Sequence, residues 1–236
     1  GTGFRFPSLY EAYYVYAAHP GTRDTLKAEK SESFDFGFEK SFSELGLNLD
    51  LTYFNTKYID ALEGWEGNTL NSPTWGSTTM NSTSTTKSQG LELLSKWKTN
   101  DALNFDFNYT YTSTYDGAEQ DDPNRNLNYN NSQLVRVPRN IFNLITNIKI
   151  PRYDNLDLTL KTKWSDVARD YGNGNRTFKD ERLDDYLVND LSIKYNLMNT
   201  YNLFFDINNI MDEKYETARD YSQMDRSFNL GIRRAY

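Results

Sequence analysis

The chain has 236 residues, no cysteine, a formal net charge of −7 and 15% aromatic residues, among them 18 Tyr and 14 Phe. Its mean hydropathy is negative, and no run of about 18 apolar residues occurs, which excludes helical membrane spans. The aromatic content argues against a disordered chain, and the acidic balance argues against nucleic-acid binding, which needs a basic surface.

One class of protein combines many aromatic residues with a hydrophilic average. In a transmembrane β-barrel only every second residue of a strand faces lipid, so averaged hydropathy does not detect the strands. The lack of cysteine also fits an oxidising compartment. Composition therefore favours an all-β, antiparallel up-and-down transmembrane barrel.

Alternation of apolar and polar residues runs through most of the chain. It is clearest where Leu103, Phe105 and Phe107 alternate with polar residues, and where Leu156 begins a similar series. A period of two residues predicts strands with one apolar face. The predicted strands cover about 33–39, 44–59, 87–98, 103–111, 134–150, 156–164, 183–197, 201–208 and 226–236. Most of them reach the roughly 9–11 residues that a tilted strand needs to cross a bilayer.

The connections between these strands alternate between short and long. Short turns are expected near 43–44, 99–101, 152–155 and 198–200, and long polar loops at about 7–30, 60–86, 116–133, 170–182 and 216–225. Bacterial barrels have short periplasmic turns and longer extracellular loops, so the pattern also gives the orientation. We count about nine complete strands and an N-terminal stub, without a second domain. Because Gly1 stands in what reads as a strand end, we expect the natural N-terminus to be missing.

Aromatic residues gather where the strands should meet the membrane interfaces, as expected for the girdles of a barrel. They are Tyr53, Phe54, Tyr58, Trp97, Trp164 and Tyr171. An ordinary soluble β-protein is the alternative, since aromatic cross-strand pairs also occur there. Its strands are seldom so long, and its long loops are not confined to one side.

The last predicted strand carries Phe228, Leu230 and Ile232 at alternate positions and ends on Tyr236. This ending resembles the terminal strand that the outer-membrane assembly machinery recognises, so we expect an authentic C-terminus. Arg234 interrupts the apolar face close to the periplasmic interface, where a cation costs little.

Three stretches resemble TonB-dependent receptors. Residues 3–11 (GFRFPSLYE) with 26–31 (LKAEKS) are similar to the family pattern FRAPSLxELY…LKPEKS, with Phe6 and Ala28 as departures. Residues 87–92 (KSQGLE) are similar to the opening of an inward strand. Residues 208–217 (NNIMDEKYET) with 226–228 (RSF) resemble the family's final hairpin, with Met211 in place of Phe and Asp225 in place of Gly.

The resemblance implies a barrel of about 22 strands, of which residues 1–236 would supply roughly the last ten, without the plug domain and the earlier strands. It implies uptake of a scarce nutrient, energised by TonB through the missing plug. The segment 135–139 (VRVPR) and the modest loops are most like cobalamin receptors, while siderophore and haem receptors share most features. Lipid, lipopolysaccharide and the plug would be further partners, and Lys161 and Lys163 could pair with plug carboxylates.

Candidate ligand contacts are aromatic residues in the extracellular loops, because aromatic side chains dominate binding hot spots. They are Trp65, Trp75, Tyr171 and Tyr221. Anchoring of the loops to the rim or to lipopolysaccharide is the alternative role for the two Trp residues.

A metal site is only weakly indicated. Four carboxylates of one loop, Asp116, Glu119, Asp121 and Asp122, are the candidates, but Leu127 and Gln133 replace the Gly and Glu of a calcium loop. Calcium binding in such receptors would use loops outside this chain. We therefore expect no cofactor and a solvated loop.

No catalytic residue is predicted, because His19 is the only histidine and has no partner motif. The function expected is active import across the outer membrane, without enzymatic activity. A passive porin-like or structural barrel is the alternative.

Overall fold

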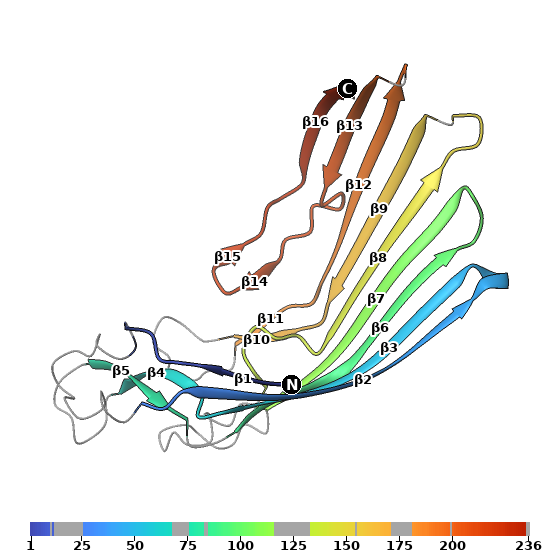
Figure 1. Ribbon diagram of the computed structural model, residues 1–236. Coiled ribbons are helices and arrows are strands. Elements are labelled where there is room, and N and C mark those ends of the chain that lie inside the picture. The colour runs from blue at the N-terminus through green and yellow to red at the C-terminus, as the bar shows by residue number, and fades with distance from the viewer. Residues whose placement is uncertain are drawn as a thin grey trace. The chain divides into compact units, whose positions relative to one another are not determined.

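The computed structural model describes residues 1–9, 11, 26–67, 76–82, 85–115, 133–153, 155–170, 181–198 and 200–234. Ten antiparallel strands form one sheet in the order β1-β2-β3-β6-β7-β8-β9-β12-β13-β16 (Figure 1). Their bounds are β1 Thr2–Arg5, β2 Glu29–Phe42, β3 Leu47–Ile59, β6 Thr86–Lys98, β7 Leu103–Tyr115, β8 Asn140–Lys149, β9 Leu156–Ser165, β12 Tyr186–Leu197, β13 Tyr201–Asn208 and β16 Ser227–Arg234. The all-β, up-and-down architecture and the nine strands with an N-terminal stub are confirmed.

Three small hairpins lie in the long connections: β4 (Leu62–Gly67) with β5 (Gly76–Asn81), β10 (Ala168–Asp170) with β11 (Glu181–Leu183), and β14 (Glu216–Ala218) with β15 (Tyr221–Ser222). The sequence did not predict these hairpins. No helix among the described residues has the length and apolarity of a membrane span.

The chain divides into two compact parts. The first comprises residues 1–35, 54–89 and 113–134, where β1 pairs with β2 and β4 pairs with β5. The second comprises residues 36–53, 90–112 and 135–236, and it contains the complete strands β8, β9, β12, β13 and β16.

The strand registers of the second part separate an apolar face from a polar face. An unbroken apolar row crosses six strands through Leu103, Ile148, Leu158, Ile193, Phe205 and Leu230. The neighbouring residues form an unbroken polar row on the opposite face: Asn104, Asn147, Thr159, Ser192, Asp206 and Asn229. Directly paired residues project to the same side of a sheet, so the alternation read from the sequence is confirmed.

The apolar face remains uncovered. Phe228, Leu230 and Ile232 are 62%, 83% and 66% exposed, and the only buried hydrophobic side chains among the described residues are Ala168, Leu183, Tyr186 and Val188. A water-soluble sheet would have to cover such a face. Here the apolar face is the one suited to lipid, and the polar face is the one suited to a barrel lumen.

Two tryptophans tie strand ends to neighbouring turns. The indole N–H of Trp97 donates to the Leu45 carbonyl at 3.1 Å beside the short turn after β2, and that of Trp164 donates to Asp185 at 3.3 Å before β12. The two residues therefore mark opposite ends of the strands, as predicted for interfacial girdles.

The short turn between β2 and β3 depends on Gly46, whose φ is +61°. A Cβ at this position would collide with the carbonyl oxygen of Lys98, while the Lys98 N–H donates to the Gly46 carbonyl at 2.9 Å. Only glycine fits both the left-handed backbone and this close approach.

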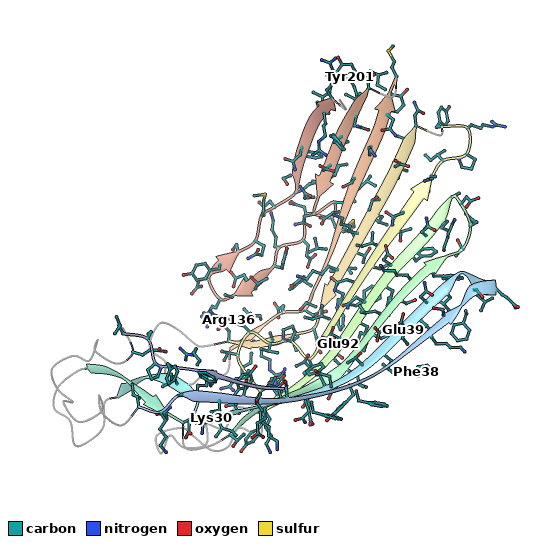
Figure 2. All side chains as sticks on the ribbon, viewed as in Figure 1. Lys30, Phe38, Glu39, Glu92, Arg136 and Tyr201 are labelled. Carbon is teal, nitrogen blue, oxygen red and sulfur yellow. The ribbon has the colours of Figure 1, made fainter. Side chains whose placement is uncertain are left out.

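The largest error in a predicted strand boundary lies before β8. The strand predicted at 134–150 begins only at Asn140. Arg136 has a φ of +60°, and Pro138 has no N–H to give to a ladder. The alternating residues before Asn140 therefore form a turn, which lies at the end of the strands where β10 is found (Arg136 in Figure 2).

Candidate functional site

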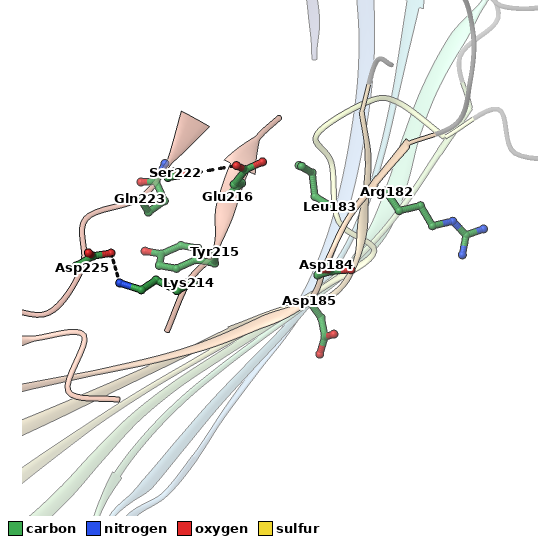
Figure 3. A pocket seen from close by; sticks show the side chains of 10 residues that line it. All are labelled: Arg182, Leu183, Asp184, Asp185, Lys214, Tyr215, Glu216, Ser222, Gln223 and Asp225. Carbon is green, nitrogen blue, oxygen red and sulfur yellow. Dashed lines mark hydrogen bonds and ion pairs between the residues drawn. The ribbon is translucent and has the colours of Figure 1, made fainter. Parts of the chain in front are cut away.

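A pocket of ≈ 600 Å³ opens beside the corner where β11 ends and β12 begins, among the long connections (Figure 3). We call it the rim pocket. Residues from the corner between β11 and β12 line one side, and residues from the connection between β13 and β16 line the other. They are Arg182, Leu183, Asp184, Asp185, Lys214, Tyr215, Glu216, Ser222, Gln223 and Asp225.

An aromatic pair holds one wall of the rim pocket against the sheet. The ring of Tyr215 lies 4.3 Å from that of Tyr186, centroid to centroid, and Lys163 Nζ lies 5.6 Å from the centre of the Tyr186 ring. Tyr186 pairs with Ser165 on the polar face. The connection between β13 and β16 therefore folds over the lumen side of the sheet.

Burial raises the pKa of the Tyr215 phenol above its ordinary value of 10.0, and the nearby Tyr186 and Asp190 add to this effect. The phenol is therefore protonated at neutral pH. A hydrogen-bond donor that stays protonated suits contact with oxygen ligands.

The charges around the pocket are mainly negative. Its lining contains four carboxylates (Asp184, Asp185, Glu216 and Asp225) and two cations (Arg182 and Lys214), a formal balance of −2. Lys214 Nζ lies 2.6 Å from Asp225 and 3.5 Å from Asp212. The Asp225 bond is the main reason why the pKa of Lys214 is raised from 10.5. The carboxylates can accept hydrogen bonds from a ligand, and Arg182 and Lys214 can donate to its oxygen atoms.

Asn209 organises the base of the connection. It is 3% exposed and has a φ of +52°. Its amide nitrogen donates to the carbonyls of Glu213 and Met224 at 2.9 and 3.3 Å, and its amide oxygen accepts from the Glu213 N–H at 2.8 Å. Its own backbone N–H donates to Asp190 at 2.8 Å. One side chain thus closes both ends of the segment that carries Tyr215.

Asp212 also links the two ends of the connection that carries Tyr215. Its carboxylate accepts the backbone N–H of Arg226 at 2.8 Å, and that bond is the main reason why its pKa is lowered from 3.8. Asn209, Asp212 and Arg226 belong to the stretch that resembles the final hairpin of the receptor family. These residues of the family-like stretch therefore serve to hold together the two ends of the connection between β13 and β16.

The N-terminal part has a polar network of its own. Arg5 donates to both carboxylate oxygens of Glu11 at 2.9 and 3.1 Å, and to Glu29 at 3.3 Å. Ser8 and Glu11 exchange bonds reciprocally, since the Ser8 N–H donates to Glu11 at 2.7 Å and the Glu11 N–H donates to Ser8 Oγ at 3.2 Å. This is a capping box. The Glu29 carboxylate also accepts the Leu62 N–H at 3.1 Å. The family-like segments 3–11 and 26–31 therefore hold the ends of two long connections, the one before β2 and the one after β3.

Of the four predicted ligand contacts, only Tyr221 has a described side chain. Tyr221 lies in β15 and is 70% exposed, but it does not line the rim pocket, to which its neighbours Ser222 and Gln223 contribute. Trp65 lies in β4, with its side chain outside the described residues. Trp75, Tyr171, His19 and the four carboxylates Asp116, Glu119, Asp121 and Asp122 also lie outside them.

Sequence reasoning missed Tyr215 as a pocket residue and Tyr186 as the ring that packs against it. The signal for Tyr215 was present, because it belongs to the stretch 208–217. Tyr186 carried no comparable signal, since it reads as one more aromatic residue at a strand start. In the described part of the chain, no group of three or more His, Asp or Glu side chains is arranged to hold a metal ion.

Comparison with solved structures finds receptors of the same fold. The ferric enterobactin receptor of Pseudomonas aeruginosa, solved with enterobactin, is 20% identical with a TM-score of 0.76, over 98% of this chain and 37% of that one. The ferric-catecholate import receptor Fiu of E. coli K12 is 14% identical with a TM-score of 0.72, over 98% and 31%. The pyoverdine outer membrane receptor FpvA of P. aeruginosa PAO1 is 17% identical with a TM-score of 0.67, over 89% and 30%.

The chain thus spans about a third of the length of these solved receptors. No curated protein matches it by sequence. A family model described as "TonB dependent receptor-like, beta-barrel" matches residues 1–210, and the solved relatives are receptors of the Gram-negative outer membrane. The chain therefore belongs to the TonB-dependent receptor β-barrel family of the outer membrane.

Proposed function

We propose that the chain forms the C-terminal part of the barrel of an active importer that takes up a ferric siderophore, with energy delivered by TonB through a plug domain. The rim pocket carries this proposal, because it lies among the long connections, at the strand ends that we take to be extracellular, and its Tyr215 wall folds over the polar face of the sheet. A ligand captured there stands at the entrance to the lumen. The receptor would have no enzymatic activity of its own.

The choice of a siderophore is supported by the receptors that share the fold. Those named above are receptors for enterobactin, ferric catecholates and pyoverdine. Cobalamin, favoured by the sequence resemblance, has no such support and becomes the second candidate ligand. The segment 135–139 that suggested it forms a turn tied to β10, which accounts for its pattern without any ligand, because the Arg136 N–H donates to the Arg169 carbonyl at 2.7 Å.

The test is equilibrium binding to the complete receptor purified in detergent. Ferric enterobactin and ferric pyoverdine are the siderophore probes, and cyanocobalamin with calcium present is the competing one. Saturable submicromolar binding of an iron chelate, with none of cyanocobalamin, supports the proposal. Binding of cyanocobalamin alone would overturn the choice of ligand.

The passive-barrel alternative is separated by energy dependence. Uptake of the bound chelate into cells should stop when TonB is deleted, whereas diffusion through an open lumen would continue at the same rate. Uptake that is unchanged without TonB would show that transport is not energised by TonB.

A further inference from the structure

A buried carboxylate joins three segments of the rim that are far apart in the sequence. Asp170, the last residue of β10, is 2% exposed. Its Oδ1 accepts the Arg136 Nε–H at 2.9 Å, and its Oδ2 accepts the backbone N–H of Arg219 at 2.6 Å. Arg136 precedes β8, and Arg219 stands in the turn between β14 and β15.

These bonds explain why a charged side chain is buried there. An isolated carboxylate is very unfavourable away from water, whereas a paired and hydrogen-bonded one is tolerated. Arg136 supplies the opposite charge, and its backbone N–H donates to the Arg169 carbonyl at 2.7 Å. Arg136 is thus joined to β10 through both its side chain and its backbone, in spite of its φ of +60°.

The hairpin of β14 and β15 is short, and its side-chain hydrogen bonds from Asp220 N–H to Glu216 and from Gln223 to Thr217 stay within the segment. Its register consists of Glu216 with Ser222 and Ala218 with Tyr221, with an irregularity between them. A two-stranded hairpin is marginally stable at best in water. Yet its Glu216 and Ser222 line the rim pocket, so the shape of that side of the pocket depends on where the hairpin is docked.

The base of the hairpin is fixed by Asn209 and Tyr215, as described above, whereas its turn is held by Asp170. We infer that Asp170 is a positioning residue: its carboxylate docks the β14–β15 hairpin as a wall of the rim pocket and makes it move together with the segment before β8. The pocket belongs to the proposed function, but the docking itself does not depend on which ligand is bound.

The direct test is hydrogen exchange of the complete receptor in detergent. Asp170→Asn keeps the shape of the side chain, but its NH₂ group cannot accept a hydrogen bond, so one of the two donors loses its acceptor. We expect the amides of 216–223 to exchange roughly tenfold faster, the effect of losing about one hydrogen bond. The amides of β12 and β13 should be unchanged.

The matched control is Asp184→Asn, which removes a negative charge from an exposed residue of the same pocket. It should leave exchange of 216–223 as in the parent receptor. If Asp170→Asn also changes that exchange by less than twofold, the inference is wrong.

A second measurement keeps the inference testable if Asp170→Asn does not fold. In the unaltered receptor, the Arg219 amide, which donates to the buried Asp170, should exchange far more slowly than the Asp220 amide, which donates to Glu216 at the surface. Equal rates for the two amides would overturn the docking role.

The affinity for ferric enterobactin measures whether the docking of the hairpin affects ligand binding. If the parent receptor binds this probe, Asp170→Asn should weaken binding severalfold. If the parent does not bind it, the choice of that ligand fails while the exchange result still decides the role of Asp170.

Discussion

The Arg5 guanidinium donates two hydrogen bonds to the Glu11 carboxylate, at 2.9 and 3.1 Å, across six residues of chain. Glu11 in turn accepts the Ser8 N–H at 2.7 Å. These bonds fix the path of the chain where β1 ends at Arg5 and the first long connection begins. They also explain why the segment 3–11 resembles the receptor family, since Arg5, Ser8 and Glu11 are matched residues.

Replacing Glu11 by Gln should loosen this turn without unfolding the barrel. Gln cannot match the charge of Arg5, and it has one acceptor oxygen where the Glu11 carboxylate uses two. We expect a severalfold faster exchange of the Ser8 amide and an unchanged midpoint of thermal unfolding, because exposed ion pairs contribute little. Glu32→Gln, an exposed position in β2, is the control. A fall in the unfolding midpoint for Glu11→Gln alone would show a larger role.

The same turn should depend on pH in a defined direction. The pKa of Glu11 is lowered from 4.5, chiefly by the Ser8 N–H and then by Arg5. A lowered pKa in the folded state means that the stabilisation is complete above 4.5 and is lost as the pH falls through the lower, folded value. Exchange of the Ser8 amide, corrected for its intrinsic pH dependence, should therefore be constant from pH 7 to 5 and rise below about 4. Glu11→Gln should abolish that rise, and an equal rise in the variant would refute the assignment.

Most strands could be predicted because their pattern is local. In β13 the alternation predicted Tyr201–Asn208, the bounds that the structure has. The same reasoning failed before Asn140, where the alternating residues form a turn instead. A period of two residues does not report a positive φ such as that of Arg136.

The polar anchors of the rim could not be predicted from sequence. Asp170 reads as a solvated loop residue, because its partners lie 34 and 49 positions away and no local spacing reveals them. Asn209 is different, since it lies inside a recognisable stretch. The resemblance indicated that Asn209 mattered, and the contacts show that its role is to close a loop.

Because the two faces of the sheet differ, the same substitution at two adjacent positions of β12 should have different effects. Leu191 pairs with Leu160 and Ile207 on the apolar face, whereas Ser192 pairs with Thr159 and Asp206 on the polar face. Leu191→Arg would place a cation against lipid, at a cost of about 2–4 kcal/mol near the bilayer midplane.

Ser192→Arg is the matched control, because it places the same side chain beside the Asp206 carboxylate and should cost far less. The measurement is the fraction of complete receptor that folds into lipid vesicles, read from gel mobility of unheated samples. Equal losses for the two variants would mean that the faces are assigned wrongly.

Asn209 gives the last prediction, because its backbone and side-chain roles can be separated. Asn209→Gly keeps the positive φ of +52° but loses the three side-chain bonds, each worth about 1 kcal/mol. Asn209→Ala loses the same bonds and also places a Cβ in the left-handed region, which adds about 1 kcal/mol. Asn209→Asp keeps the acceptor for the Glu213 N–H but cannot donate to the Glu213 and Met224 carbonyls.

Local stability of 209–226, measured by hydrogen exchange, should therefore fall in the order parent, Gly, Ala. Asp should be no better than Gly, because its charge would face two carbonyl oxygens in a buried position. An Asp variant as protected as the parent would show that the donated bonds do not hold the loop.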